Sequence, residues 1–192
     1  MTRAITPSQT IGPFFHQALL REQWSDLAAD DSRADIMTIE GRVLDGDGAA
    51  VSDAMIEIWQ ADATGHYNHP EDRGDGVAKN SGFRGFARIA TGPDGGFRLR
   101  TIKPGLVPGA GEALQAPHIN VSVFARGLLK RLATRIYFPD EPLNQRDAVL
   151  NAVPPARRFT LIAHRAPGRT GERVLRFDIV LQGERETVFF DI

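Results

Sequence analysis

Short apolar segments separated by turn-forming residues constrain the fold of this chain more than any other feature. After residue 35, β-branched and aromatic residues recur in brief runs that glycine, proline or aspartate interrupt. Many short strands favour a sandwich over alternating β–α units, so we predict an all-β fold, a β-sandwich of about eight antiparallel strands. The expected strands are Met37–Leu44, Ala54–Gln60, Phe83–Thr91, Phe97–Ile102, Ile119–Phe124, Thr134–Phe138, Phe159–Ala163 and Val174–Leu181.

A short helical insertion is expected within the sandwich. Residues Glu141–Val153 have the pattern of a helix that Asp140 caps and that Pro154 and Pro155 stop.

The first 35 residues differ from the rest in composition. Two prolines and a glycine in Thr6–Phe15 predict an extended N-terminal arm, yet this arm carries exposed aromatic residues. Such residues need a surface to bury against, and the arm's own domain and another chain are equally plausible surfaces. We therefore expect residues 1–35 to form an arm and linker, and residues 36–192 to form the sandwich.

Composition excludes several functional classes. The net charge is −1, with 23 Lys and Arg against 24 Asp and Glu, so no nucleic-acid partner is expected. No apolar run approaches the roughly 20 residues of a membrane span, so no membrane association is expected. The absence of cysteine excludes disulfides and thiolate metal sites. We expect a cytoplasmic protein.

The stretch Ala116–Gly127 is the strongest candidate for one wall of a site. On a strand, His118, Asn120 and Ser122 share one face, while apolar residues occupy the other. A lone histidine is more often structural than a metal ligand, because a metal needs several converging ligands. Arg126, at the end of this strand, either binds a carboxylate through its planar fork or is an exposed strand-end arginine.

An ordered set of motifs resembles the intradiol ring-cleavage dioxygenases over nearly the whole chain. The motifs are Thr6-Pro-Ser-Gln-Thr-x-Gly-Pro13, Trp59-Gln-Ala-Asp-Ala-x-Gly-x-Tyr67, Thr101-Ile-Lys-Pro-Gly105, Ala116-Pro-His-Ile-Asn120, Phe124-Ala-Arg-Gly127 and Gly183–Ile192. The resemblance implies a β-sandwich fold and a mononuclear, non-haem Fe(III) held by two tyrosines and two histidines, which are ligands suited to a hard cation.

Only part of that ligand set is present in this chain. Tyr67 and His118 match the first tyrosine and the first histidine, and are remnant ligand positions. Asn120 stands at the second histidine position and Val107 at the second tyrosine position. Gln115 stands where the family has its catalytic arginine. We therefore expect this chain to hold no metal and to provide no catalytic residue alone.

In lacking these residues, the chain resembles the alpha type of chain in this family, which pairs with an iron-bearing beta chain of the same fold. The resemblance implies a higher-order alpha–beta oligomer in which the beta subunit holds Fe(III). It also implies cleavage of the small aromatic substrate 3,4-dihydroxybenzoate by O2, giving 3-carboxy-cis,cis-muconate. The alpha chain would line the substrate entrance of the beta site. The residues implied are Thr10, Gly12, Pro13, Phe14 and Arg126; the family has tyrosine where Phe14 stands.

Two alternatives remain at this point. One is a homomeric iron dioxygenase with an altered ligand set, using Tyr67 and His118 with Tyr137, His66 or His69. The other is a non-enzymatic β-sandwich module that binds a partner through its arm.

Overall fold

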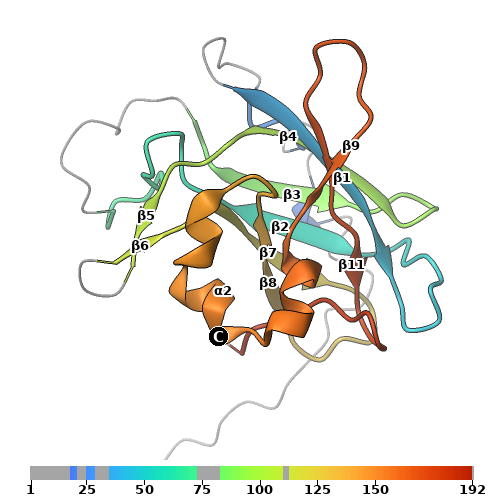
Figure 1. The fold of residues 1–192 in the computed structure, drawn as a ribbon. Coiled ribbons are helices and arrows are strands. Elements are labelled where there is room, and N and C mark those ends of the chain that lie inside the picture. The colour runs from blue at the N-terminus through green and yellow to red at the C-terminus, as the bar shows by residue number, and fades with distance from the viewer. Residues whose placement is uncertain (1–17, 21–24, 29–34, 73–82, 110–112, 192) are drawn as a thin grey trace, which may run out of the picture.

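Two β-sheets packed face to face form the body of the molecule (Figure 1). The computed structural model describes residues 18–20, 25–28, 35–72, 83–109 and 113–191. One sheet has four antiparallel strands in the order β3-β2-β7-β8; the other has five, with β4, β10 and β11 pairing with β1, and β9 with β10. The strands are β1 (Ile36–Leu44), β2 (Met55–Trp59), β3 (Phe86–Ala90), β4 (Gly96–Ile102), β7 (His118–Phe124), β8 (Leu132–Tyr137), β9 (His164–Ala166), β10 (Val174–Arg176) and β11 (Ile179–Val180), with a separate ribbon of β5 (Val107–Pro108) and β6 (Leu114–Gln115). The predicted β-sandwich is confirmed.

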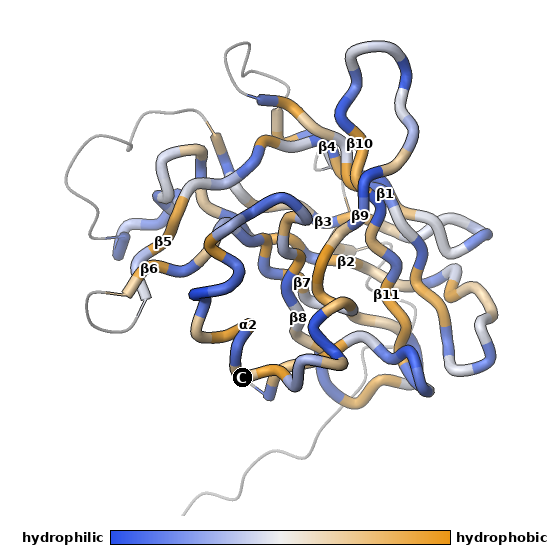
Figure 2. The backbone as a smooth tube through the Cα atoms, viewed as in Figure 1, coloured by the Kyte–Doolittle hydropathy of each residue, from blue (hydrophilic) through white to orange (hydrophobic). Residues whose placement is uncertain are grey.

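The core lies between the two sheets. Alternate residues of each strand point inward, as Ile39 and Leu99 do from one sheet and Ile56 and Val121 from the other. Figure 2 shows the hydrophobic colours concentrated along the strands and the hydrophilic colours in the outer loops. This alternation leaves the polar row of β7 on the face of the four-stranded sheet that points away from the core.

The five-stranded sheet is mixed, whereas antiparallel pairing was expected throughout. Strands β10 and β11 both run parallel to β1, and they replace the single predicted strand Val174–Leu181. Asp178 lies in the break between them, where its carboxylate accepts the backbone N–H of Arg42 at 2.9 Å. Gly41 allows the close approach, because a Cβ there would lie 1.8 Å from the carbonyl oxygen of Phe177.

The predicted helix Glu141–Val153 is present as two shorter helices. They are the 3₁₀ helix η3 (Pro142–Gln145) and the α-helix α2 (Ala148–Ala152). Asp147 separates them, because its backbone is extended and its side chain caps α2 by accepting the N–H of Leu150. Glu141, rather than the predicted Asp140, caps the first helix.

The predicted strand Phe159–Ala163 is wrong. Residues Pro155–Leu161 form the 3₁₀ helix η4, with a proline in its first turn. Proline fixes the backbone near helical φ and removes an N–H that a strand ladder would need, so the Pro154-Pro155 pair starts a helical turn here.

Residues 25–28, which fall in the predicted arm and linker, pack on the sandwich. Arg100 of β4 makes two hydrogen bonds of 2.9 Å to the carboxylate of Asp26, and Leu27 and Ala28 are buried in the core. Among the residues described, no helix has the length and apolar character needed to cross a membrane.

Candidate functional site

The loop that follows β2 is shaped by one carboxylate. Asp62 accepts hydrogen bonds from the N–H and hydroxyl of Thr64, at 2.8 and 2.7 Å, and from the N–H of His66 at 3.1 Å. An aspartate that bonds the backbone just after it stabilises a tight turn. This turn leads the chain directly to Tyr67.

Two glycines lock the Tyr67 loop onto the segment after β4. Gly65 has φ of +91°, and a Cβ there would lie 1.8 Å from the carbonyl oxygen of Leu106. Gly105 donates its N–H to the carbonyl of Asp62 at 2.8 Å. The glycines of two motifs that lie far apart in the sequence therefore meet, and the position of Tyr67 depends on both.

Tyr67 is a neutral phenol in a mostly apolar setting. Its ring stacks on Trp59 with centroids 5.6 Å apart and planes 12° apart. Its hydroxyl oxygen accepts a hydrogen bond from the side-chain amide of Asn120 at 3.2 Å. Burial raises the pKa of Tyr67, and the amide of Asn120 and the charge of Arg135 only partly oppose this rise.

His118 is the first residue of β7 and is 1% exposed. Its Nδ1 lies 2.7 Å from the carbonyl oxygen of Ala116, so Nδ1 carries the proton and donates it there. Burial, together with the smaller effect of the charge of Arg135, lowers the pKa of His118 to about 4. The neutral ring leaves Nε2 as a buried acceptor with no hydrogen-bond partner in the described part of the chain.

The buried carboxylate of Asp147 holds the surroundings of His118 together. It accepts the N–H of Ala116 at 2.8 Å, the N–H of Leu150 at 2.8 Å and the hydroxyl of Tyr137 at 3.0 Å. Tyr137 pairs with His118 across β7 and β8. One side chain therefore fixes the entry to β7, the start of α2 and the end of β8.

Arg135 provides the positive charge of the site. It pairs with Asn120 across β7 and β8, and its Nη1 donates to the side-chain oxygen of Gln115 at 2.8 Å and to the hydroxyl of Tyr137 at 3.3 Å. The resemblance assigns the family's arginine position to Gln115. The guanidinium of Arg135, on β8, reaches the side chain of Gln115 and so brings a positive charge to that position. Sequence reasoning missed Arg135, although its spacing from Tyr137 puts both on one face of a strand.

The residues present do not fit a ferric ion. Asn120 bonds to the hydroxyl of Tyr67 instead of providing an imidazole, and Val107 lies buried in β5 where a second tyrosinate would be needed. In the described ranges no group of three His, Cys, Asp or Glu side chains converges as metal ligands do.

Within the described part of the chain, His66, His69 and Tyr137 do not complete a ligand set. His66 lies 3.9 Å from the carboxylate of Asp72, and His69 meets the edge of Trp59 with ring centroids 6.5 Å apart. The hydroxyl of Tyr137 is held by Asp147 and Arg135.

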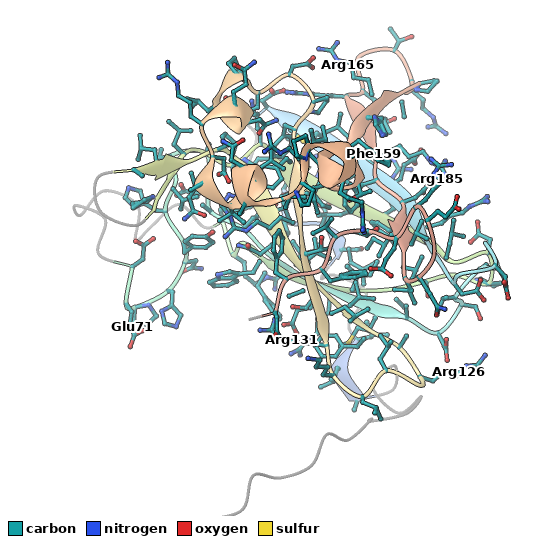
Figure 3. The ribbon with its side chains drawn as sticks, turned by 60° about the horizontal axis from the view of Figure 1, so that its bottom comes forward. Glu71, Arg126, Arg131, Phe159, Arg165 and Arg185 are labelled. Carbon is teal, nitrogen blue, oxygen red and sulfur yellow. The ribbon has the colours of Figure 1, made fainter. Side chains whose placement is uncertain are left out.

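Arg126 lies far from this cluster. It follows β7 at the end of the strand opposite His118, its side chain is 74% exposed, and its Nε lies 3.0 Å from the carboxylate of Asp53. Figure 3 shows Arg126 at the edge of the molecule, on the opposite side from Glu71. The predicted arm residues Thr10, Gly12, Pro13 and Phe14 lie outside the described residues.

Comparison with known proteins gives consistent matches. A family model described as Dioxygenase matches residues 11–183. The chain is 46% identical to the protocatechuate 3,4-dioxygenase alpha chain of Burkholderia cepacia over 97% of each chain. It is 36% identical to the beta chain from the same organism over 79% of this chain and 66% of that one. Among solved structures, the dioxygenase domain of a carbohydrate-binding fusion protein from Streptomyces sp. SirexAA-E matches with a TM-score of 0.63 and 29% identity, over 93% of this chain and 98% of that one.

Replacing the central carboxylate should destabilise the whole fold. In the Asp147→Asn variant the amide retains one acceptor oxygen, so at least one of the three buried donors loses its partner. We expect the free energy of unfolding to fall by about 2–4 kcal/mol, measured by urea denaturation. The exposed Asp191 provides a control, since Asp191→Asn removes the same charge where no buried group depends on it. Equal stability of the two variants would contradict the role of Asp147.

The buried neutral histidine should make stability depend on pH. Because the pKa of His118 is lowered to about 4 in the folded state, its contribution is fully present above the unfolded pKa of 6.5 and is lost as the pH falls toward 4. Between pH 6.5 and pH 4 we expect His118 to lower the free energy of unfolding by up to about 3 kcal/mol, and this loss should be absent in the His118→Asn variant. The exposed His164 is the control, through His164→Asn. An NMR titration that placed the His118 pKa near 6.5 would contradict the prediction.

Proposed function

The chain belongs to the dioxygenase family, and we propose that it is the alpha chain of a protocatechuate 3,4-dioxygenase. The similarity to alpha chains over nearly the full length carries the proposal. The reaction is intradiol cleavage of 3,4-dihydroxybenzoate, in which both atoms of O2 enter between the hydroxyl-bearing carbons and 3-carboxy-cis,cis-muconate forms.

In this proposal a beta subunit holds the iron. The hydrogen bond between Asn120 and Tyr67 supports this division, because it joins two positions at which an iron-bearing chain needs ligands. The similarity to both alpha and beta chains supports an alpha–beta hetero-oligomer. When bound in the beta subunit, Fe(III) supplies the redox chemistry that this chain lacks.

The role proposed for this chain is to shape the substrate entrance of the partner. Residues 1–35 act as an arm and linker, and Thr10, Gly12, Pro13 and Phe14 of the arm meet the substrate. Residues 36–192 form the sandwich that presents Arg126. The exposure of Arg126 and its distance from His118 support this role, because a side chain at that end of β7 can reach another subunit but not its own remnant site.

Iron content tests the division of labour between the subunits. We expect the chain purified alone to contain less than stoichiometric iron, to lack a tyrosinate charge-transfer band and to cleave no substrate. Co-purified with its cognate beta chain, it should form a coloured complex that cleaves 3,4-dihydroxybenzoate. A coloured and active isolated chain would favour a homomeric iron dioxygenase, and failure to assemble with any iron-bearing relative would favour a non-enzymatic module.

Arg126 should affect substrate handling in the assembled enzyme. We expect Arg126→Ala to lower kcat/KM by the equivalent of about 1–3 kcal/mol, because a charge-assisted hydrogen bond to the substrate carboxylate is lost. Lys130→Ala is the matched control, since it removes an exposed cation from the same β7–β8 loop.

The ion pair with Asp53 needs its own control. Asp53→Ala leaves Arg126 in place but removes its partner within this chain. If Asp53→Ala lowered kcat/KM as much as Arg126→Ala, the ion pair rather than substrate contact would explain the loss. Unchanged kinetics in Arg126→Ala would remove Arg126 from the entrance.

A further inference from the structure

A small cavity lies at the base of the β9–β10 hairpin, between that hairpin, η4, β11 and the C-terminal segment. We call it the hairpin-base cavity. None of the residues that line it belongs to the site around Tyr67 and His118. Its volume is about 130 Å³, well below the roughly 300–1,000 Å³ of sites that take larger organic ligands. A cavity of this size has room for a small ion and a few waters.

Three basic side chains line this cavity from two separate parts of the chain. His164 of β9 and Arg176 of β10 are directly paired across the two strands, so their side chains lie on the same face. Arg185 comes from the C-terminal segment, within the Gly183–Ile192 motif. Figure 3 shows Arg185 near Phe159, which also lines the cavity. Donors from distant parts of the sequence therefore meet around one space.

The carboxylate in the lining, Asp178, already has its own partners. One oxygen accepts the backbone N–H of Arg42 at 2.9 Å and Nη2 of Arg176 at 3.1 Å. The other oxygen accepts Nε of Arg176 at 3.2 Å. The charges of Asp178 and Arg176 therefore compensate each other, and Nη1 of Arg176 makes no hydrogen bond to another described residue.

The side chains of Arg185 and His164 have neither a hydrogen-bond partner nor an ion-pair partner within the described ranges. Since a guanidinium stays charged, the cavity keeps a positive charge after Asp178 and Arg176 have compensated each other. Apolar side chains form other parts of its wall. By limiting the access of water, such a wall strengthens the attraction between a cation and an anion.

The arrangement of the donors favours a tetrahedral oxyanion over a carboxylate. A carboxylate has two oxygens in one plane, and a single guanidinium can bind both. A tetrahedral oxyanion presents oxygens in several directions, which suits donors that come from a strand pair and from a separate segment. Arginine is also the side chain best suited to phosphate, because its planar fork binds two oxygens at once.

We propose that the hairpin-base cavity binds inorganic phosphate, with Arg185, Arg176 and His164 donating hydrogen bonds to its oxygens. The anion is bound without chemical change. The proposal goes beyond the dioxygenase function, because it needs neither the iron, nor the beta subunit, nor 3,4-dihydroxybenzoate.

Equilibrium dialysis of radiolabelled inorganic phosphate tests the proposal on the full-length chain. Chloride keeps the ionic strength constant, because salt screens any general attraction between exposed charges and an anion. We expect one saturable site per chain, from which sulfate displaces phosphate and acetate does so about tenfold less well. Absence of a saturable site would overturn the proposal, and equal displacement by acetate would overturn the preference for a tetrahedral anion.

A phosphate monoester offers the same chemistry from a different source. Because the cavity is small, we expect glycerol 3-phosphate to bind more weakly than inorganic phosphate. Tighter binding of glycerol 3-phosphate would overturn the free ion as the ligand of this cavity.

Variants assign the site to Arg185. In Arg185→Gln we expect the affinity for phosphate to fall by about tenfold or more, because charge-assisted hydrogen bonds are lost. Arg185→Lys keeps the charge without the fork and should give an intermediate loss. The exposed Arg169 of the β9–β10 turn is the matched control, and Arg169→Gln should bind phosphate as the unmodified chain does. Equal affinity in the Arg185→Gln and Arg169→Gln variants would overturn the site.

Thermal unfolding gives a second measurement on the same variants. Phosphate should raise the melting temperature of the unmodified chain and of Arg169→Gln, because a ligand that binds only the folded state stabilises it. It should raise that of Arg185→Gln much less. If Arg185→Gln does not fold, Arg185→Lys carries both measurements.

The same dialysis on the complex with the beta chain separates this proposal from the dioxygenase function. Any phosphate bound by the partner remains in the Arg185→Gln complex, so the difference between the two complexes measures the hairpin-base cavity. A difference in the isolated chain that disappears in the complex would mean that the partner covers the cavity, and would overturn the proposal for the assembled protein. Cleavage of 3,4-dihydroxybenzoate should be the same in both complexes, so either proposal can fail while the other stands.

Discussion

The carboxylate of Asp147 is the interaction on which the site region depends. It ties α2 to the paired strands β7 and β8, because it accepts from the backbone before β7, from the first turn of α2 and from the hydroxyl that ends β8. Since the carboxylate is fully buried, each of these donors would otherwise lack a partner in a low-dielectric interior. The position of His118, two residues after Ala116, follows from this arrangement.

Around that carboxylate, a hydrogen bond joins two positions at which the resemblance expects metal ligands, and Arg135 brings a cation to the position of the family's arginine. The side-chain amide of Asn120 donates a hydrogen bond to the hydroxyl of Tyr67. Arg135 donates to the hydroxyl of Tyr137, which in turn donates to Asp147. A guanidinium is always charged, so it keeps positive charge in the site without any metal.

Particular residues mark how far the sequence predicted the structure. The alternation in β7 correctly placed His118 and Asn120 on one face, and six of the eight expected strands lie close to their predicted bounds. The two failures near the C-terminus have local causes. The Pro154-Pro155 pair began a 3₁₀ helix, and the carboxylate of Asp178 split one expected strand into two.

By itself, the sequence determined the sandwich, the family and the missing ligands, because alternation, turn residues and ordered motifs are all properties of local order along the chain. Only the tertiary structure decided that Asp147 lies beneath Tyr137, that Arg135 reaches the place of the missing arginine, and that the Tyr67 loop rests on Gly105. Each of these contacts joins residues on different elements. Its existence depends on how strands and helices pack, and nothing in the spacing of residues along one segment specifies that packing.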